Sequence, residues 1–380
     1  MKTAFKKIAE MMHHSCPDES FAFEFWDGDR ISFGKAPCVT LHFKTKECVK
    51  KIIRSGYMGF GESYMERALE IVGDMQRLFR LGFSINFDES TLSILEKLRF
   101  FITSLINRDT LRRVPKNISH HYDLGNEFYS FFLDKTMTYS CAYFNNKDDS
   151  LEQAQLNKYE HISRKLLLKP NESLLDIGCG WGGMLIYAAQ NYGINGVGIT
   201  LSKNQYEDAH RKIKELGLDS QIKVIYKDYR HLTGSFDKVV SIGMFEHVGK
   251  KFIPIFIKKI SVLLKKEGLG LLHTIGKDTP SSGDPWTFKY IFPGGYLPCL
   301  AEIIREMGKT GFSILDVENL RWHYAKTLEH WVGNYELNGL FLNGSIAGFS
   351  YGDSRLFQVL FSNGINNELP PTRMHVYNKS

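Results

Sequence analysis

The sequence contains no apolar run long enough to cross a membrane. Spanning a bilayer takes roughly 18–20 consecutive apolar residues, and the longest candidate, residues 92–106, is interrupted by Glu96, Lys97 and Arg99. The first residues, MKTAFKKIAEMMHH, also lack the apolar core of a secretory signal. We therefore expect a cytoplasmic protein.

Cysteine is scarce, and its spacing does not suit disulfide bonds or metal binding. No two of the cysteines form a C-x-x-C pair, which argues against a disulfide framework. Adjacent histidines, as in His13-His14 and His120-His121, cannot easily turn both rings toward one ion, and no Cys/His spacing matches a zinc site. We expect free thiols and no metal. The six cysteines stand at positions 16, 38, 48, 141, 179 and 299.

The charge balance does not indicate nucleic-acid binding. The 48 Lys and Arg residues against 42 Asp and Glu leave a formal charge of +6 that is well mixed along the chain. Basic clusters such as Lys50-Lys51-Arg54 would favour an anionic membrane surface, although one such cluster is more often a solvated face. We expect no nucleic-acid partner.

At 380 residues the chain is long for a single core and suggests two domains. Residues 108–119 are polar and basic, contain Pro115 and lack strong periodicity, so they are the candidate linker. We predict a first, smaller α+β domain at 1–113 and a second at 114–380. In the first we expect an N-terminal helix, a strand at 38–43 and helices at 61–75 and 90–107. The apolar stripe of the last helix fits either core packing or a lipid contact.

The second domain alternates strand-like and helix-like segments. This alternation predicts a mostly parallel sheet with helices on both faces, a Rossmann-like α/β fold. Ligands of such sheets bind outside the carboxyl ends of the strands. The predicted strands are 174–177, 196–200, 222–226, 238–242 and 268–274, and the predicted helices are 126–133, 151–168, 181–191, 202–216 and 252–264.

Residues 174–183, LLDIGCGWGG, organise this second domain. Asp176 lies in a buried strand that runs into glycines, which let the backbone approach a ligand closely. Gly178, Gly180 and Gly183 also satisfy G-x-G-x-x-G, a weak dinucleotide pattern. A nicotinamide enzyme would place an acidic residue after the next strand, yet no carboxylate follows strand 196–200 until Glu207. The missing acid favours S-adenosylmethionine.

Several side chains follow the strands where this cofactor would bind. Each one alone is explained equally well as a turn residue or a helix cap, and Ser202 is a natural N-cap. As a set they favour a cofactor site. The residues predicted from this placement are Asp176, Gly178, Gly180, Gly182, Thr200, Leu201, Ser202, Gln205, Tyr229 and Arg230.

A carboxylate and two imidazoles stand at the ends of neighbouring strands. Glu246 and His247 follow the fourth strand and His273 ends the fifth. Such a convergence is what acid–base chemistry requires. Taken one at a time, however, Glu246 could be a surface acid and either histidine a buried, hydrogen-bonded core residue.

Eight blocks of the sequence resemble the cyclopropane-fatty-acid-phospholipid synthases. Together they cover roughly the last two thirds of the chain, and the first hundred residues resemble the family far less. The resemblance implies a class I methyltransferase fold for the second domain and lipid handling for the first. The blocks are HYDLGNEFY (121–129), TYSCAYF (138–144), LLDIGCGWGG (174–183), GITLSKNQ (198–205), GMFEHVG (243–249), LLHTIG (271–276), KYIFPGG (289–295) and FQVLFSNGINN (357–367).

The resemblance also implies a set of functional positions. It adds Tyr139 and Ser140 to the cofactor contacts. It further implies a bicarbonate ion, which would act as the base, held by Cys141, Glu246, His273, Ile275 and Tyr324.

We expect transfer of a methylene unit from S-adenosylmethionine to a cis double bond in an acyl chain of a phospholipid, forming a cyclopropane ring. The protein would associate peripherally with a membrane surface, and we allow for a homodimer. Three alternatives remain open: a methyltransferase acting on a small-molecule amine, an enzyme that methylates the chain without closing the ring, and a lipid-binding module whose enzymatic half has decayed.

Overall fold

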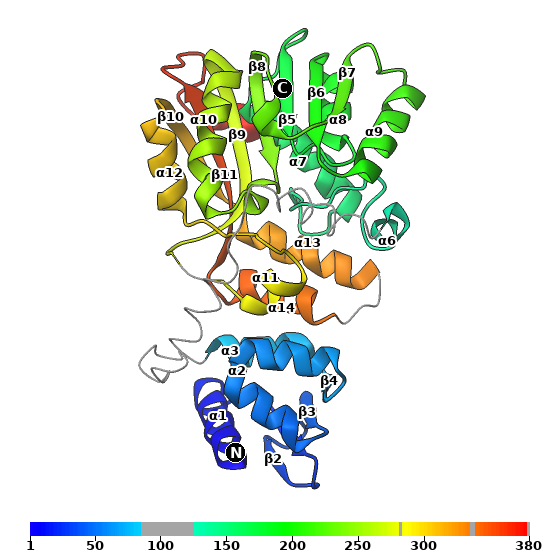
Figure 1. Ribbon diagram of the computed structural model, residues 1–380, viewed down its shortest axis with the longest axis vertical. Coiled ribbons are helices and arrows are strands. Elements are labelled where there is room, and N and C mark those ends of the chain that lie inside the picture. Colours follow the sequence, from blue (N-terminus) through cyan, green and yellow to red (C-terminus); the bar gives the residue numbers. More distant parts are fainter. Residues whose placement is uncertain (85–124, 281–282, 335–338, 378–380) are drawn as a thin grey trace. The chain divides into compact units, whose positions relative to one another are not determined.

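The computed structural model describes residues 1–84, 125–280, 283–334 and 339–377 (Figure 1). The chain forms two compact units. The first comprises Met1–Arg108, Ser282–Pro293 and Glu336–Asp353, and the second comprises Asp109–Ser281, Gly294–Tyr335 and Ser354–Ser380. The sequence predicted continuous domains at 1–113 and 114–380, whereas two later segments join the first unit. The predicted linker at 108–119 lies outside the described residues.

The second unit is built on a seven-stranded sheet with the order β10-β11-β9-β8-β5-β6-β7. All strands run parallel except β11, which is antiparallel to both β9 and β10. This mostly parallel sheet confirms the predicted fold class. The strands are β5 (Ser173–Ile177), β6 (Asn195–Thr200), β7 (Ile222–Tyr226), β8 (Phe236–Ile242), β9 (Leu264–Lys277), β10 (Phe312–Asn319) and β11 (Ser354–Asn363).

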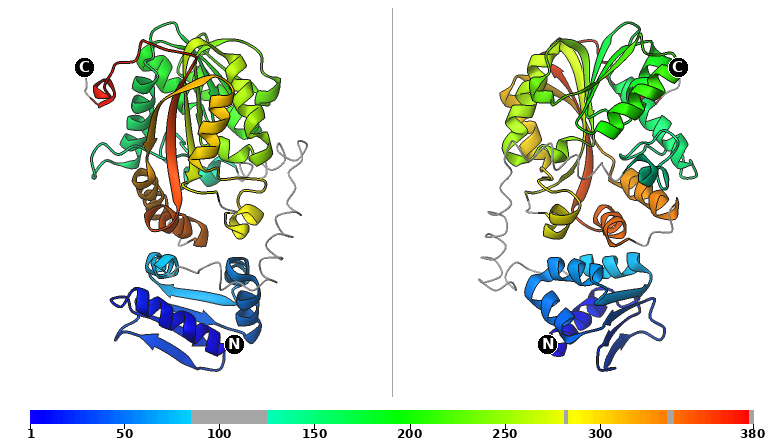
Figure 2. Two further views of the ribbon diagram at one scale, coloured as in Figure 1. Left: turned by 90° about the vertical axis from the view of Figure 1, so that its left-hand side faces the viewer. Right: turned by 45° about the vertical axis from the view of Figure 1, so that its right-hand side comes forward.

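Helices cover both faces of this sheet (Figure 2). One apolar cluster joins the strands to α7 (Leu151–Lys165), α8 (Gly183–Tyr192) and α9 (Lys203–Glu215). Another joins them to α10 (Ile253–Leu263) and α12 (Leu300–Lys309). Because both faces are covered, the central strands are nearly continuous apolar runs, which is why they could be predicted. The unit also contains α6 (Asn126–Ser130), α13 (Arg321–Asn334) and α15 (Met374–Tyr377).

The strand order creates a switch point between β5 and β8. From β5 the chain continues to β6 and β7 on one side of the sheet, and it then returns to form β8 and β9 on the other side. Connections that leave in opposite directions open a crevice at the carboxyl ends of the two adjacent strands. The glycine-rich segment after β5 lies at this crevice.

The first unit contains a four-stranded sheet with the order β2-β1-β3-β4. The predicted strand at 38–43 is confirmed as β3, but the predicted helix at 61–75 is wrong, because α2 ends at Met65 and β4 begins at Leu69. Residues 69–73 form a strand since they pair with β3. The predicted helix at 90–107 lies outside the described residues. The elements are α1 (Lys2–Ser15), β1 (Phe21–Phe25), β2 (Arg30–Phe33), β3 (Val39–Phe43), α2 (Lys46–Met65), β4 (Leu69–Gly73) and α3 (Met75–Ser84).

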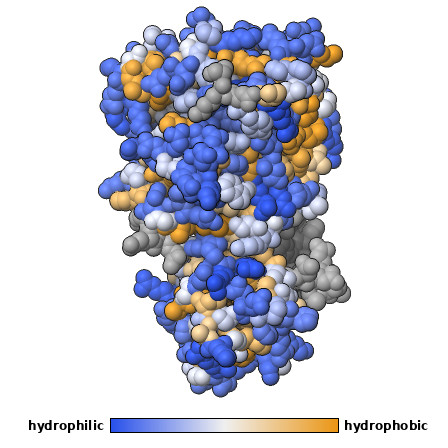
Figure 3. Space-filling model, turned by 180° about the vertical axis from the view of Figure 1, so that it is seen from behind, coloured by the Kyte–Doolittle hydropathy of each residue, from blue (hydrophilic) through white to orange (hydrophobic). Residues whose placement is uncertain are grey.

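Two later helices complete the first unit. α11 (Pro285–Tyr290) and α14 (Leu340–Ser350) supply Trp286 and Leu340 to a cluster around Met75. Polar contacts hold them as well: Tyr290 Oη donates to Glu62 at 2.9 Å. No helix in the described part of the chain is both long and apolar enough to cross a membrane. On the face drawn in Figure 3, polar residues cover most of the surface and apolar ones form scattered groups.

Candidate active site

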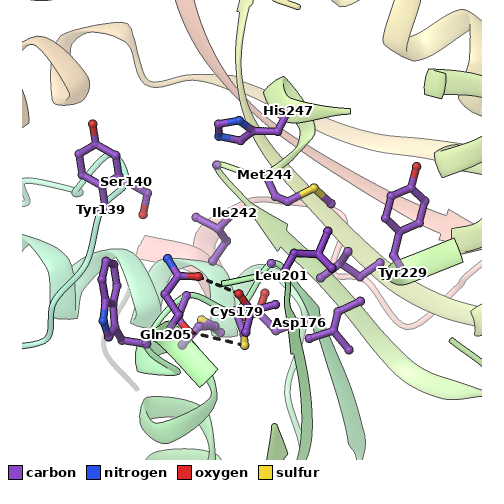
Figure 4. A pocket seen from close by; sticks show the side chains of 18 of the residues that line it. Tyr139, Ser140, Asp176, Cys179, Leu201, Gln205, Tyr229, Ile242, Met244 and His247 are labelled. Carbon is purple, nitrogen blue, oxygen red and sulfur yellow. Dashed lines mark hydrogen bonds between the residues drawn. The ribbon is translucent and has the colours of Figure 1, made fainter. Parts of the chain in front are cut away.

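A pocket lies at the carboxyl ends of β5, β6, β7 and β8 (Figure 4). It brings together most of the predicted cofactor residues, with Tyr139 and Ser140 on one side of the view and Tyr229 on the other. Gly182 and Ser202 do not line it: they are the N-caps of α8 and α9. The predicted residues that line the pocket are Tyr139, Ser140, Asp176, Gly178, Gly180, Thr200, Leu201, Gln205, Tyr229 and Arg230.

The glycine loop after β5 keeps space open for a ligand. The backbone N–H of Gly178 donates to the carbonyl of Ile199 at 3.0 Å, which fixes the loop against β6. At Gly178, φ is +88° and a Cβ would lie 2.7 Å from Met244 Cβ. At Gly180, φ is +56° and a Cβ would meet no protein atom within 4 Å. A side chain at Gly180 would therefore occupy pocket space.

The segment after β6 presents neutral polar groups. Thr200 Oγ1 donates to Gln205 Oε1 at 2.8 Å and accepts from the backbone N–H of Ser202 at 3.1 Å. This orientation leaves the amide N–H groups of Gln205 as donors at the pocket. Farther along, the Arg230 guanidinium binds Asp228 through two hydrogen bonds of 2.9 and 2.5 Å. The wall thus suits ribose and adenine.

The turn that carries Tyr139 and Ser140 is held by two helices. From α7, Gln155 Nε2 donates to the Ser140 carbonyl at 2.9 Å and Lys158 Nζ donates to Ser140 Oγ at 3.0 Å. From α13, the Trp331 ring stacks on Tyr139 with centroids 5.1 Å apart. Both side chains therefore have fixed positions.

Two buried charged groups, Lys158 and Asp176, also line the pocket. Burial is the main cause that lowers the pKa of Lys158 to about 7 and raises the pKa of Asp176 to about 7, against their mutual attraction. We did not predict Lys158 from the sequence. A signal was present, because Leu151, Lys158 and Ile162 recur at helical spacing and share the buried face of α7.

Glu246 and Ile275 form one direct link within the predicted bicarbonate site. The backbone N–H of Ile275 donates to Glu246 Oε1 at 2.6 Å. Glu246 Oε2 is buried and has no hydrogen-bond partner among the described residues. Burial raises the pKa of this carboxyl group to about 7. The neighbouring His247 lines the cofactor pocket, and burial lowers its pKa to about 4.

His273 is fully buried and its ring proton can be placed. Lys165 Nζ lies 2.9 Å from Gln358 Oε1 and can only donate, so the amide group must turn its Nε2 toward His273 Nδ1, 3.1 Å away. His273 Nδ1 therefore accepts. Burial lowers the pKa of His273, which keeps the ring neutral with its proton on Nε2. Within the described part of the chain, this Nε2 has no hydrogen-bond partner.

Cys141 and Tyr324 come from other segments. Cys141 follows Ser140, and burial raises the pKa of its thiol. The turn packs near β8, since a Cβ on Gly243 would lie 3.5 Å from Ser140 Cβ, and the Gly243 N–H donates to the His273 carbonyl at 2.9 Å. Tyr324 lies on α13. Within the described ranges, no three His, Cys, Asp or Glu side chains are grouped as metal ligands.

Comparisons with known proteins give a consistent result. A family model described as mycolic acid cyclopropane synthetase matches residues 109–339, and a domain of unknown function (DUF7884) matches residues 8–91. A cyclopropane-fatty-acyl-phospholipid synthase of Escherichia coli is 37% identical over 90% of this chain and 92% of its own. A probable fatty acid methyltransferase of Pseudomonas putida is 34% identical over 93% of this chain and 95% of its own.

Two solved structures resemble about two thirds of this chain. The cyclopropane synthase MmaA2 from Mycobacterium tuberculosis has a TM-score of 0.62 at 32% identity. The mycolic acid cyclopropane synthase CmaA1, complexed with SAH and CTAB, has a TM-score of 0.62 at 33% identity. Each match covers 65% of this chain and 98% of the other.

Proposed function

The chain belongs to the mycolic acid cyclopropane synthetase family, and we propose that it transfers a methylene group from S-adenosylmethionine to the cis double bond of an unsaturated phospholipid acyl chain, closing a cyclopropane ring. The observation that carries this proposal is the pairing of an S-adenosylmethionine-type pocket with two buried atoms, Glu246 Oε2 and His273 Nε2, that have no hydrogen-bond partner among the residues the structure describes. Buried polar atoms without partners are rare in folded proteins, so a ligand is the natural explanation.

The polar groups of the pocket suit the cofactor. Its walls offer the amide N–H groups of Gln205, which Thr200 orients, to neutral acceptors, while the open space at Gly180 admits the ligand. When bound, S-adenosylmethionine supplies an electrophilic methyl group, which a weakly nucleophilic alkene requires. The protein's own task is to orient the donor and to exclude water from the cationic chain.

The unsatisfied atoms fit bicarbonate, which can accept and donate at once. His273 Nε2–H would donate to it and an ionised Glu246 Oε2 would accept its O–H, so that two anions become compatible neighbours. When bound, bicarbonate supplies a small base for the proton that must leave before the ring closes. Cys141, Tyr324 and the Ile275 backbone complete this proposed site. The Ile275 N–H already donates to Glu246, which sets the direction of the carboxylate.

We further propose that the first unit handles lipid and that the protein associates peripherally with a membrane. Basic side chains on α2 support this, because Lys50 and Arg54 are exposed on one helix. Replacing both by Glu should weaken binding to anionic vesicles in a sedimentation assay, by roughly 1 kcal/mol per removed charge, and should leave S-adenosylhomocysteine binding unchanged. Equal binding of wild type and variant to anionic vesicles would remove this role from α2.

Methyl transfer is tested with radiolabelled S-adenosylmethionine and two matched phospholipid vesicles, one with monounsaturated and one with saturated chains. Label should enter the unsaturated chains only. Transfer should fall when dissolved carbonate is stripped from the buffer and return when it is restored. A rate indifferent to carbonate would sink the bicarbonate assignment and leave a side chain of the protein as the direct base.

A second outcome has specific support. The Pseudomonas putida relative is described as a probable fatty acid methyltransferase, so label in a methyl branch would assign chain methylation without ring closure to this protein.

A further inference from the structure

A chain of buried polar side chains leads from α7 to His273. Gln358 of β11 stands directly opposite His273 of β9 in the antiparallel register, so the two side chains project from the same face of the sheet. Lys165 of α7 reaches this face, with its Nζ 2.9 Å from Gln358 Oε1. All three side chains are buried. Because bulk water is excluded, their polar atoms depend on one another for hydrogen bonds.

The far end of this chain is an ion pair. Lys165 Nζ lies 2.5 Å from Glu318 Oε2 and 3.7 Å from Asp316 Oδ2. His161 Nε2 lies 2.7 Å from the same Glu318 oxygen. A buried ammonium needs an anionic partner to stay charged, and a charged ammonium has no lone pair with which to accept. The ion pair therefore fixes Lys165 as a donor toward Gln358.

This donor determines the direction of every hydrogen bond that follows. Lys165 occupies Gln358 Oε1, which leaves the NH₂ group of Gln358 to donate to His273 Nδ1 at 3.1 Å. A neutral imidazole that accepts at Nδ1 carries its proton on Nε2. His273 Nε2 is buried, and no residue that the structure describes accepts a hydrogen bond from it. The chain thus ends in a buried N–H group that a ligand can use.

We propose that Lys165, held by Glu318, is a positioning residue for the base site: acting through Gln358, it fixes His273 as the Nε2–H tautomer and keeps a hydrogen-bond donor available to the small anion that serves as base. This assignment rests on the proposed function and deepens it, because it makes His273 a ligand of the base and not the base itself. Lys165, Glu318 and Gln358 lie outside the described wall of the cofactor pocket. The ion pair therefore acts on the base site separately from cofactor binding.

Nitrogen-15 NMR of the histidine rings reads the tautomer directly and needs no substrate. The signals of His273 are identified by their loss in His273→Asn. Wild type should show the Nε2–H form, because one hydrogen bond from a charged donor gives a roughly 10- to 150-fold preference. Lys165→Met removes this preference, so the two tautomers should become comparable in population. Lys169→Met, which replaces an exposed lysine just after the same helix, is the matched control and should keep the wild-type signals.

A charge swap extends the test to the reaction. Lys165→Glu combined with Glu318→Lys keeps an ion pair but presents a carboxylate to Gln358, whose NH₂ group should turn toward it. Gln358 Oε1 then holds the proton on His273 Nδ1, which leaves a lone pair on Nε2. The bicarbonate concentration needed for half-maximal rate should rise roughly 10- to 150-fold, while the calorimetric affinity for S-adenosylhomocysteine changes by less than about 2-fold. In Lys165→Met the rise should be only about 2-fold, because roughly half of the rings keep the donor.

Three results would overturn the proposal. They are an Nδ1–H tautomer in wild type, an unchanged Nε2–H form in Lys165→Met, and a loss of cofactor affinity as large as the rise in the bicarbonate requirement, which would give Lys165 a general structural role. If one of the two variants fails to fold, the other decides. A wild-type rate indifferent to carbonate would instead overturn the proposed base, and the tautomer of His273 would then test the role of Lys165 by itself.

Discussion

Replacing Glu246 by Gln is the sharpest perturbation of the proposed base site. The substitution keeps an Oε1 that can still accept from the Ile275 N–H, now 2.6 Å away, so the local backbone should be preserved. At the other position it replaces an unsatisfied acceptor by an NH₂ donor. Bicarbonate would then face a donor where its own O–H needs an acceptor. Acid–base contributions of about 10²- to 10⁴-fold set the expected loss of kcat.

The assay measures initial rates on monounsaturated vesicles as bicarbonate is varied. Glu246→Gln should lower kcat and should raise the bicarbonate concentration needed for half-maximal rate, while calorimetry shows an unchanged affinity for S-adenosylhomocysteine. Glu207→Gln, which alters a solvent-exposed carboxylate on α9, is the matched control and should behave like wild type. A Glu246→Gln enzyme with the wild-type rate and bicarbonate dependence would refute the reasoning.

The pH dependence of Glu246 gives an independent check. Burial raises its pKa from 4.5 to about 7, so the folded protein holds this proton more tightly than the unfolded chain does. The stabilising contribution is fully present below pH 4.5 and is lost as the pH rises through about 7. Glu246→Gln should therefore become more stable relative to wild type across this window, as measured by urea unfolding. If the wild-type site needs the ionised carboxylate, activity should rise through the same pH range.

Three further outcomes follow from the geometry. Gly180→Val should abolish S-adenosylhomocysteine binding in calorimetry. Because the backbone at position 180 is left-handed, the substitution should cost only about 1–3 kcal/mol of stability. Retained affinity would argue against the loop as the cofactor site. Gln358→Leu removes the donor that fixes the ring of His273. The bicarbonate concentration needed for half-maximal rate should rise by a larger factor than the cofactor affinity changes. The reverse pattern would contradict this positioning role. Burial opposes ionisation of Glu318, but hydrogen bonding to His161 lowers the pKa of its carboxyl group to about 2. Glu318→Gln should therefore destabilise the protein above pH 4.5, and the difference in stability should fade toward pH 2. A pH-independent difference in urea unfolding would contradict this linkage.

The central strands were predictable because they are buried on both faces. Residues 222–226 form β7 with the predicted bounds, and Ser202 caps α9 as expected, since its Oγ accepts from the Gln205 N–H at 3.3 Å. These features depend on local apolar runs and local hydrogen bonds. They were therefore visible in the sequence.

The errors came from pairing between distant segments. Residues 69–73 form β4 because β3 offers them a partner, and no local pattern distinguishes this strand from a continuation of α2. Likewise Trp286 and Leu340 belong to the first unit through contacts with Met75, more than two hundred residues earlier. Periodicity carries no information about such contacts.

The sequence predicted most residues of the candidate site but not the hydrogen bonds that their side chains make or lack. The strand ends and the resemblance located Glu246 and His273. Only the structure shows that each has one buried polar atom with no hydrogen-bond partner in the described ranges. Lys158 was missed because an isolated lysine usually indicates a solvated face. Its place on the buried stripe of α7 was the available signal.

The fate of the transferred carbon tests the account most directly. Wild-type protein is incubated with S-adenosylmethionine carrying a carbon-13 methyl group and with monounsaturated phospholipid vesicles in bicarbonate buffer, and the extracted acyl chains are examined by NMR. We predict that the label appears as a ring methylene, with two inequivalent protons coupled to the protons on the former alkene carbons. Label found in a methyl branch, or transferred to an added amine and absent from the chains, would contradict the account.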